Sequence, residues 1–514
     1  MLLLGLLLLS QVAAFVGRIA LISSHQAIVE AMDNDAGEGV KVGQRSHWVN
    51  DNGFRYYGPL YYRIAQTLSW TSFSTGAENL PPALENEKAV HFSLMLLSLL
   101  SVYGLAWVLA SLLTRDHLLK MLGVMLIAPA CLLNPIWSQF LFTVHPDLFL
   151  AFLCAAAMAA SLRMAADPDD AFRWKWAAFW WGLTLSTKLS ALFLMPAQLV
   201  FLWKKGDGRG TFERCKRFTW FTLAVYLIVG FPQNFDFYGN IRSLAGLSRY
   251  SHSPTWESFF DWWRLWGVQA WAPLMTLLGF AVFLQAFPAV AERAAPSLRR
   301  SWWWIPAALS GMLLLSVRRL ILIHDYYVFP FVAVAWVLAA WLFSRWSFRP
   351  ALHSPWARGL VMLVGLAIAL PMIPPSLQAN QRVLARMRSC QPAFEKAFDI
   401  MSKVVDRGGK VLVTPYTPRP LSPLTKVHWE ITDERMTEFA PSLMVMNPIR
   451  YYGRFTDGDD VSEYVKTNNK EWPQVQAFYR RFAHRNEAQT ADGRTWKKLQ
   501  DEELLRCGIE VWEP

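Results

Sequence analysis

The sequence predicts an α-helical polytopic membrane protein of the kind that carries a small α/β domain at its C-terminus. Hydrophobic residues make up 54% of the 514 residues and charged residues only 17%, against about 25% in soluble domains. The apolar residues form long blocks up to about residue 375, and basic residues recur between these blocks. Since about 20 apolar residues cross a bilayer as a helix, the blocks predict transmembrane helices.

We expect about eleven spans. The first has no basic residues ahead of its apolar stretch, so we expect an uncleaved helix rather than a signal peptide. The two spans around Lys188 are short enough that one long helix is an alternative. The spans are predicted near 2–22, 90–113, 118–135, 147–165, 174–187, 189–203, 218–231, 271–289, 302–317, 326–343 and 357–374.

The distribution of Lys and Arg predicts the orientation of these spans, because cytoplasmic loops carry the excess of basic residues. With the N-terminus in the cytoplasm, nearly every basic cluster of the first 375 residues falls inside. The first outer loop, 23–89, and the tail, 376–514, then lie outside. The net charge of +11 therefore reflects membrane topology, and we predict no nucleic-acid partner. The high Trp content and the absence of an N-x-S/T sequon fit a bacterial inner membrane with a periplasmic tail.

The tail, 376–514, has the alternating composition of a soluble α/β domain. Apolar residues recur at helical spacing from Phe394 to Met401, and "KVLVT" and "APSLMVMN" are typical of short strands. Cys390 and Cys507 bracket this domain. They would pair in an oxidising compartment, and two separate thiols are the alternative.

Ionisable residues gather at the predicted outer ends of the spans. His145 and Asp147 begin one span, where Asp147 is either a helix cap or a functional residue. Lys188 is either a snorkelling anchor or functional. The segment "RRLILIHDYY" places His324 and Tyr326 just before another span, as an interfacial aromatic belt or as part of a site. Charged groups that converge on one membrane face indicate a site for an anionic, lipid-borne substrate.

Four motifs, "YYGPLYY", "HPDLFLAF", "TKLSALFLMP" and "HDYYVFPFVAVAW", occur in an order that resembles the GT-C superfamily of integral membrane glycosyltransferases. The closest branch is the protein O-mannosyltransferase and lipid A aminoarabinose transferase type. The resemblance implies a GT-C-like transmembrane catalytic domain at 1–375 followed by an extracytoplasmic domain at 376–514. It also implies partners: membrane lipid, a lipid-linked sugar donor, and an acceptor that is a protein, a glycan or a lipid.

The resemblance further implies a reaction. A carboxylate of the first outer loop deprotonates an acceptor hydroxyl, which attacks the anomeric carbon of a sugar carried on a polyprenyl phosphate. The anomeric configuration inverts and the lipid phosphate leaves. Such a base must lie within hydrogen-bond reach of the acceptor, and cations or hydrogen-bond donors must meet the charge on the departing phosphate.

Carried over motif by motif, the base is Asp33 or Asp35, with Asp51 as the alternative. The Asp-Glu pair that the family has after its first helix is absent, because positions 21–25 read "LISSH". Asp147 matches a second polar position that orients the acceptor or the base. The predicted contacts to the donor and its phosphate are Arg55, Tyr57, His145, Lys188, Arg318, Arg319, His324 and Tyr326.

No cofactor is assigned beyond the polyprenyl-phosphate sugar, which is a substrate. Asp33, Asp35 and Asp147 are oxygen ligands of a kind that suits a divalent cation, but nothing in the sequence decides the matter and no metal is assigned. Two alternative functions remain open. One is an oligosaccharide ligase or polymerase with a pyrophosphate-linked donor. The other is a transporter of a lipid-linked saccharide, although transporters place polar residues near mid-span.

Overall fold

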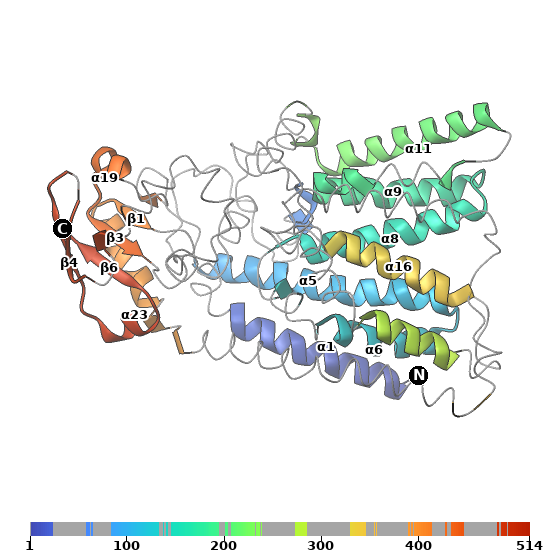
Figure 1. The fold of residues 1–514 in the computed structure, drawn as a ribbon, viewed down its shortest axis with the longest axis horizontal. Helices are drawn as coiled ribbons and strands as arrows, with labels where there is room; N and C mark the ends of the chain where they lie inside the picture. Colours follow the sequence, from blue (N-terminus) through green and yellow to red (C-terminus); the bar gives the residue numbers. More distant parts are fainter. Residues whose placement is uncertain are drawn as a thin grey trace.

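The protein, described from a computed structural model, consists of a bundle of long helices and a separate C-terminal unit built on a β-sheet (Figure 1). The bundle and the sheet lie toward opposite ends of the long axis. The structure describes residues 2–23, 58–61, 63–64, 84–132, 137, 140–141, 145–194, 201–203, 207–231, 233–236, 238, 273–284, 329–345, 354, 356, 389–390, 392–393, 395–413, 427–428, 433–446, 478, 481–482, 485–490 and 492–514.

The described helices follow the predicted apolar blocks to within a few residues at most ends. Helix α11 begins ten residues earlier than predicted, because a polar first part precedes its apolar part. The helices are α1 (Leu2–Ser23), α5 (Leu84–Leu113), α6 (His117–Leu132), α8 (Asp147–Ala166), α9 (Ala171–Thr187), α11 (Gly208–Val229) and α16 (Phe329–Arg345), with the short 3-10 helices η1 (Leu189–Leu194) and η2 (Gln233–Phe235). Residues 273–284 are also helical. The predicted spans 302–317 and 357–374 lie outside the described residues.

The predicted pair of spans around Lys188 is not one long helix. Lys188 is extended, with φ −161° and ψ 127°, and ends α9. The chain continues as the 3-10 helix η1 rather than as an α-helix. The extended backbone of Lys188 therefore separates α9 from η1, and Lys188 is itself the ionisable residue between these two predicted spans.

Helix α8 is the central helix of the bundle. It packs against α5, α9 and α16 (Figure 1), and nearly all of its side chains are buried. Its sequence, "AFLCAAAMAAS", is rich in small residues, which let neighbouring helices approach closely in membrane proteins. The first residue of this helix, Asp147, is therefore surrounded on several sides.

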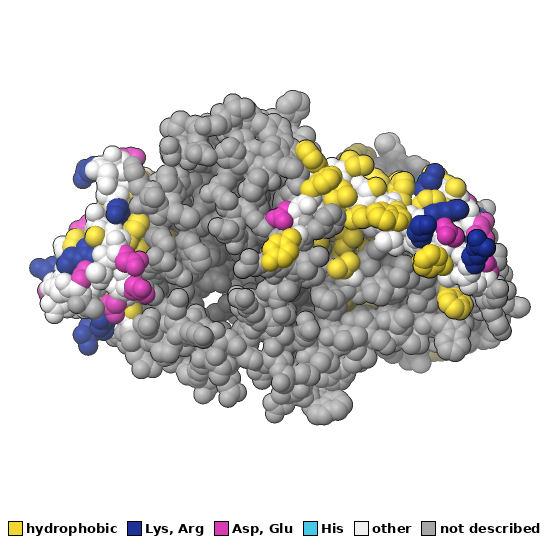
Figure 2. Space-filling view, turned by 90° about the horizontal axis from the view of Figure 1, so that it is seen from above, with side chains coloured by type: hydrophobic (Ala, Val, Ile, Leu, Met, Phe, Trp, Pro, Cys, Tyr) yellow, Lys and Arg dark blue, Asp and Glu magenta, His cyan; other side chains and the backbone are white. Residues whose placement is uncertain are grey.

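Within the described residues, two helical stretches, Phe92–Leu113 and Asp147–Ala166, are long and apolar enough to cross a bilayer, and four shorter apolar helices accompany them. The outer surface of the bundle is also apolar. In the part of α11 from Trp220 onward, Trp220 is 63% exposed and Ile228 is 75% exposed, and Figure 2 shows a band of hydrophobic side chains on this side of the molecule. A continuous exposed apolar stripe is unfavourable in water and suits contact with lipid. The predicted total of about eleven spans stays a prediction.

The two ends of the bundle differ in chemistry. At one end, Arg214 joins the α8–α9 connection to the start of α11 through ion pairs with Asp169 and Asp207. At the opposite end lie the start of α8 and the end of α9, which the contact between Asp147 and Lys188 brings together. The C-terminal unit lies beyond this second end in Figure 1. The sequence assigns the basic end to the cytoplasm and the second end to the outside.

The C-terminal unit contains a six-stranded mixed sheet in the order β2-β1-β3-β6-β5-β4. Strand β1 pairs in parallel with β2 and β3, and the other pairings are antiparallel. Strands β1 and β3 confirm the two strands predicted from "KVLVT" and "APSLMVMN". The strands are β1 (Val411–Val413), β2 (Val427–His428), β3 (Leu443–Met446), β4 (Glu487–Gln489), β5 (Thr495–Lys498) and β6 (Glu510–Glu513), and the short helices include α19 (Asp433–Phe439) and α23 (Glu502–Arg506).

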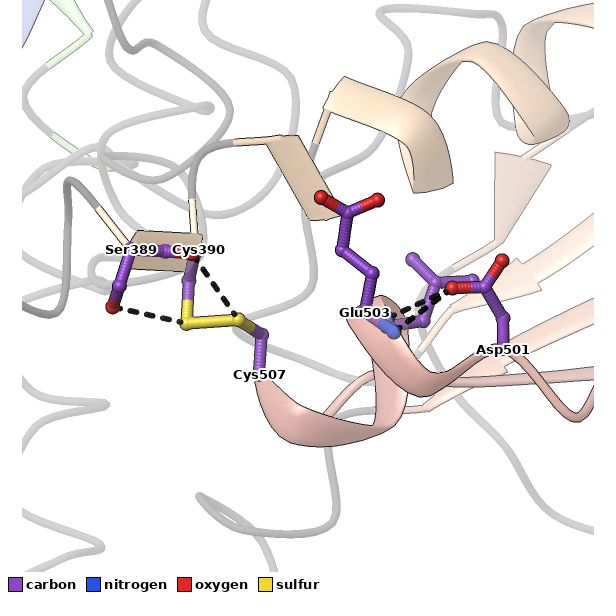
Figure 3. Close-up of a disulfide and its surroundings, with 6 residues drawn as sticks. Ser389, Cys390, Asp501, Glu503 and Cys507 are labelled. Atoms are coloured by element: carbon purple, nitrogen blue, oxygen red, sulfur yellow. Dashed lines mark hydrogen bonds between the residues drawn. A yellow bond between two sulfur atoms is a disulfide. The ribbon is translucent and has the colours of Figure 1, made fainter.

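A disulfide between Cys390 and Cys507 closes this unit, which decides between the two alternatives left by the sequence (Figure 3). It joins the start of the helix at 395–406 to the end of α23. Lys396 forms an ion pair with Asp501, and Asp501 caps α23 by accepting hydrogen bonds from its first backbone amides. The hydrogen bond from Lys396 lowers the pKa of Asp501 below its ordinary value. Two independent links therefore hold these helices together.

We predict that removal of the disulfide destabilises the C-terminal unit. The bridge spans 117 residues of sequence, and closing a loop of this size restricts the unfolded chain, so Cys390→Ser with Cys507→Ser should lower the free energy of unfolding by about 2–4 kcal/mol. Chemical denaturation of the purified protein measures this. Cys215→Ser, which removes a free cysteine, is the control. Free thiols at both positions in the denatured, unreduced protein would contradict the pairing.

Candidate active site

Three of the predicted site residues are described, and they are in contact. The Nζ atom of Lys188 lies 2.9 Å from Oδ1 and 3.1 Å from Oδ2 of Asp147. His145 approaches the same carboxylate through its Nδ1 atom. The side chains of Asp147 and Lys188 are 0% and 1% exposed, and that of His145 is 2% exposed. The cluster is thus sealed from solvent by the surrounding helices.

The local sequence explains how these residues meet. Pro146 precedes the first helical residue, and its restricted backbone favours the start of a helix at Asp147. His145 therefore lies just outside α8. On the other side, α9 ends at Thr187, and the extended backbone of Lys188 directs its side chain across to the start of α8. Two helix ends, rather than two helix faces, form the cluster.

The charges in this cluster depend on one another. A carboxylate buried without a partner is costly, and loss of one member of a buried pair costs about 3–5 kcal/mol. The carboxylate also lies in the first turn of α8, where the helix dipole favours negative charge. The N-cap position is Pro146, which forms no side-chain capping bond, so Asp147 is the first helical residue and not the N-cap. Lys188 is fully buried, so the snorkelling interpretation is wrong as well.

Residues 58–61 and 63, the first four of which belong to the motif "YYGPLYY", lie beside the same cluster. The backbone N–H of Gly58 donates to the carbonyl oxygen of Thr187 at 2.8 Å. A Cβ atom at Gly58 would lie 1.9 Å from the carbonyl oxygen of Ser186, so only glycine allows this approach. Gly58 is thereby joined to the residue that immediately precedes Lys188.

Two further side chains of this segment anchor it to the bundle. The Tyr61 hydroxyl lies 3.1 Å from the carbonyl oxygen of Leu94 and 3.1 Å from Ser98 Oγ, both on α5. Arg63 donates to the carbonyl oxygens of Val229 at 2.8 Å and Phe231 at 2.6 Å, where α11 ends. Burial lowers the pKa of Arg63 from its ordinary value, but a guanidinium stays protonated in proteins. The cation complements the negative end of the helix dipole.

The end of α11 is tied to α9 by a small polar network. Asn234 Nδ2 donates to the carbonyl oxygen of Tyr226 at 2.7 Å, and Ser186 Oγ donates to the same carbonyl at 3.2 Å. Both side chains are buried. These hydrogen bonds therefore hold the end of α9, beside Lys188, against α11.

The fourth motif reaches the cluster through aromatic rings. Phe329, the first residue of α16, packs against Phe140 with ring centroids 5.2 Å apart. Phe140 in turn packs edge-on against the His145 ring at 5.5 Å. All four motifs that carry the family resemblance therefore have described residues at this end of the bundle.

Nine of the predicted site residues lie outside the described part of the chain, and their roles stay predictions. They are Asp33, Asp35, Asp51, Arg55, Tyr57, Arg318, Arg319, His324 and Tyr326. Within the described residues, no group of three His, Cys, Asp or Glu side chains is placed to hold a metal ion. Both oxygens of Asp147 face the ammonium of Lys188, which already supplies a positive charge there.

Sequence reasoning did not assign roles to Gly58, Tyr61, Arg63 or Asn234. Two signals were available. Gly58 precedes a proline, a pair that often marks a constrained turn, and Asn234 is an amide in a largely apolar stretch. Tyr61 and Arg63 carried no separate signal, because tyrosine and arginine are ordinary residues at a membrane interface.

No protein family model matches the chain, and no curated protein matches it. Among solved structures, it is similar to ArnT from Cupriavidus metallidurans bound to undecaprenyl phosphate, with 15% identity, a TM-score of 0.49, and 87% of this chain and 94% of that chain covered. The apo state of the same protein gives 14% identity and a TM-score of 0.46, with 87% and 94% covered.

The chain is also similar to the archaeal oligosaccharyltransferase AglB from Archaeoglobus fulgidus, in complex with an inhibitory peptide and a dolichol-phosphate. Here the identity is 11% and the TM-score 0.43, with 87% of this chain and 70% of that chain covered.

The buried pair predicts a non-additive mutational cycle. Lys188→Met leaves the Asp147 carboxylate buried without its cation, and we expect a loss of about 3–5 kcal/mol in the free energy of unfolding. Asp147→Asn combined with Lys188→Met removes both charges and should recover much of that loss. Denaturation of the single and double variants in detergent measures the coupling energy. Additive losses would show that the two side chains do not interact.

The close approach of Gly58 to the backbone of Ser186 predicts that even an added methyl group at position 58 lowers the stability of the protein. Gly58→Ala places a Cβ against the backbone of Ser186, and the strain should cost about 1–3 kcal/mol of stability. Gly17→Ala in α1 meets no atom within 4 Å and serves as the control, with a neutral or slightly stabilising effect. Equal melting temperatures for the two variants would contradict the contact.

Proposed function

We propose that the protein is a membrane glycosyltransferase that moves a sugar from a polyprenyl-phosphate donor to an acceptor hydroxyl, with inversion at the anomeric carbon. The observation that supports this most directly is the meeting of the four motifs at one end of the bundle, around His145, Asp147 and Lys188. The resemblance rests on the order of the four motifs along the chain. That residues of all four motifs also lie close together in the fold is an independent observation.

The position of the site suits a lipid-linked donor. The cluster lies at helix ends, and α11, which is bonded to α9 beside Lys188, exposes apolar groups along its side. A polyprenyl chain can remain along such a surface while the phosphate and sugar reach the helix ends. Charged and hydrogen-bonding groups there would stabilise the charge that develops on the departing phosphate.

The base is proposed to be Asp33 or Asp35, with Asp51 as the alternative. All three precede the anchored segment 58–63, which holds the end of the first outer loop beside Thr187. Asp147 has both oxygens engaged by Lys188, so we assign it to positioning His145 and Lys188 rather than to proton abstraction. His145, Lys188, Arg55, Tyr57, Arg318, Arg319, His324 and Tyr326 are proposed to contact the donor or its phosphate.

The site is proposed to face the periplasm of a bacterium, with the N-terminus in the cytoplasm. The excess of Lys and Arg at the opposite loops supports this orientation. The disulfide between Cys390 and Cys507 supports it independently, because disulfides persist in oxidising compartments. The acceptor, whether protein, glycan or lipid, would approach from the side of the C-terminal unit.

The test is turnover of a donor by the purified protein. We would supply a panel of labelled polyprenyl-phosphate monosaccharides in detergent with native lipid and an acceptor extract. One donor should be consumed, and Asn at the true base among Asp33, Asp35 and Asp51 should slow this by about 10²–10⁴-fold with donor binding retained. Asp236→Asn, which alters an exposed carboxylate near the end of α11, is the control.

Other outcomes point elsewhere. Consumption of a pyrophosphate-linked donor alone would favour the ligase or polymerase. Uptake of a lipid-linked saccharide into sealed vesicles without chemical change would favour the transporter. Loss of turnover in the Asp236→Asn control as well would remove the support for a loop base.

A further inference from the structure

The exposed stripe of α11 changes character at Trp220. Before this residue the stripe carries Arg209, Lys216 and Arg217, and after it the exposed side chains are apolar, as at Ile228. Figure 2 shows Lys and Arg side chains at one end of the helices, beyond a band of hydrophobic side chains. A basic first part and an apolar remainder on one lipid-facing helix are typical of a helix that crosses from the headgroup region into the hydrocarbon.

Helix α9 adds one exposed cation beside α11. The rings of Trp174 and Phe221 pack with centroids 5.8 Å apart, which sets the two helices in register. Lys175 is exposed on α9 and therefore lies near the level of Trp220. We call the four exposed cations Lys175, Arg209, Lys216 and Arg217 the basic girdle.

Several carboxylates at this end of the bundle form ion pairs with Arg214 and Arg173, which are not girdle residues. Arg214, whose side chain is only 10% exposed, pairs with Asp169 and Asp207 and donates to the carbonyl oxygen of Leu202 at 3.2 Å. Arg173 pairs with Asp170. Within the described part of the chain, no ion pair joins a girdle residue to a carboxylate. The four girdle cations are exposed at the surface.

Exposed aromatic rings surround the girdle. Phe172 is 73% exposed, Trp203 67% and Phe212 66%. A soluble polyanion such as a nucleic acid would leave these rings in water. A lipid headgroup region accommodates both features, since aromatic belts lie at headgroup depth and anionic lipids attract clustered Lys and Arg.

We propose that the basic girdle binds the headgroups of anionic phospholipids in the leaflet at this end of the bundle. The phosphates neutralise Lys216, Arg217 and their neighbours, while the aromatic rings lie among the upper acyl carbons. Bound lipid holds α9 and α11 at a defined depth. This assignment does not depend on the proposed glycosyl transfer.

The test compares lipids by headgroup. The full-length protein, purified in detergent, is titrated with phosphatidylglycerol or phosphatidylcholine of matched chains, and bound lipid is counted by native mass spectrometry. Phosphatidylglycerol should bind on the order of tenfold more tightly, and Lys216→Gln with Arg217→Gln should remove most of that preference. Arg407→Gln with Lys497→Gln removes two exposed basic charges from the C-terminal unit and is the matched control. Added salt should weaken the wild-type preference.

Three results would overturn the proposal. Equal binding of phosphatidylglycerol and phosphatidylcholine by the wild-type protein would remove the basis for a headgroup site. An equal loss of preference in the control variant would indicate that net charge alone attracts the lipid. Displacement of phosphatidylglycerol by soluble glycerol phosphate at the same concentration would show a site for a free anion instead of a lipid surface.

Discussion

A charge buried inside a helical bundle has to be neutralised where it lies, and the pairing of Asp147 with Lys188 meets this constraint. The pair joins the start of α8, the central helix, to the end of α9. Because each charge would be costly alone, the two helix ends are held in one arrangement. The Nδ1 atom of His145 contacts the same carboxylate. The other contacts of the site surround these three side chains.

The connection at Thr187 extends this constraint to a distant part of the sequence. Thr187 accepts a hydrogen bond from Gly58, and its neighbours on either side are Ser186, which bonds to the end of α11, and Lys188. One short stretch, "STK", therefore contacts Gly58, α11 and α8. A shift of any of these elements would move Lys188 relative to Asp147.

The sequence predicted that His145, Asp147 and Lys188 lie at one end of the helices, because this follows from hydropathy and from the distribution of Lys and Arg between spans. It left open whether Lys188 points to water or to a partner, since a lone lysine at a helix end fits both. The strands β1 and β3 are fully buried and have continuous apolar runs, so they were predictable. Strands β4 and β5 alternate exposed and buried residues over three or four positions, which is too short for a clear period.

The depth of the cluster in a bilayer can be calculated from the length of α9. Lys188 lies thirteen positions after Lys175, which corresponds to a rise of about 20 Å along the helix. If Lys175 lies at the hydrocarbon boundary, a core of about 30 Å places the Asp147–Lys188 pair inside the far edge of the hydrocarbon rather than in bulk water. That depth explains why both charges are buried and paired. For the proposed glycosyl transfer, the phosphate of the lipid-linked donor would then have to lie below the membrane surface, or the bilayer would have to thin locally.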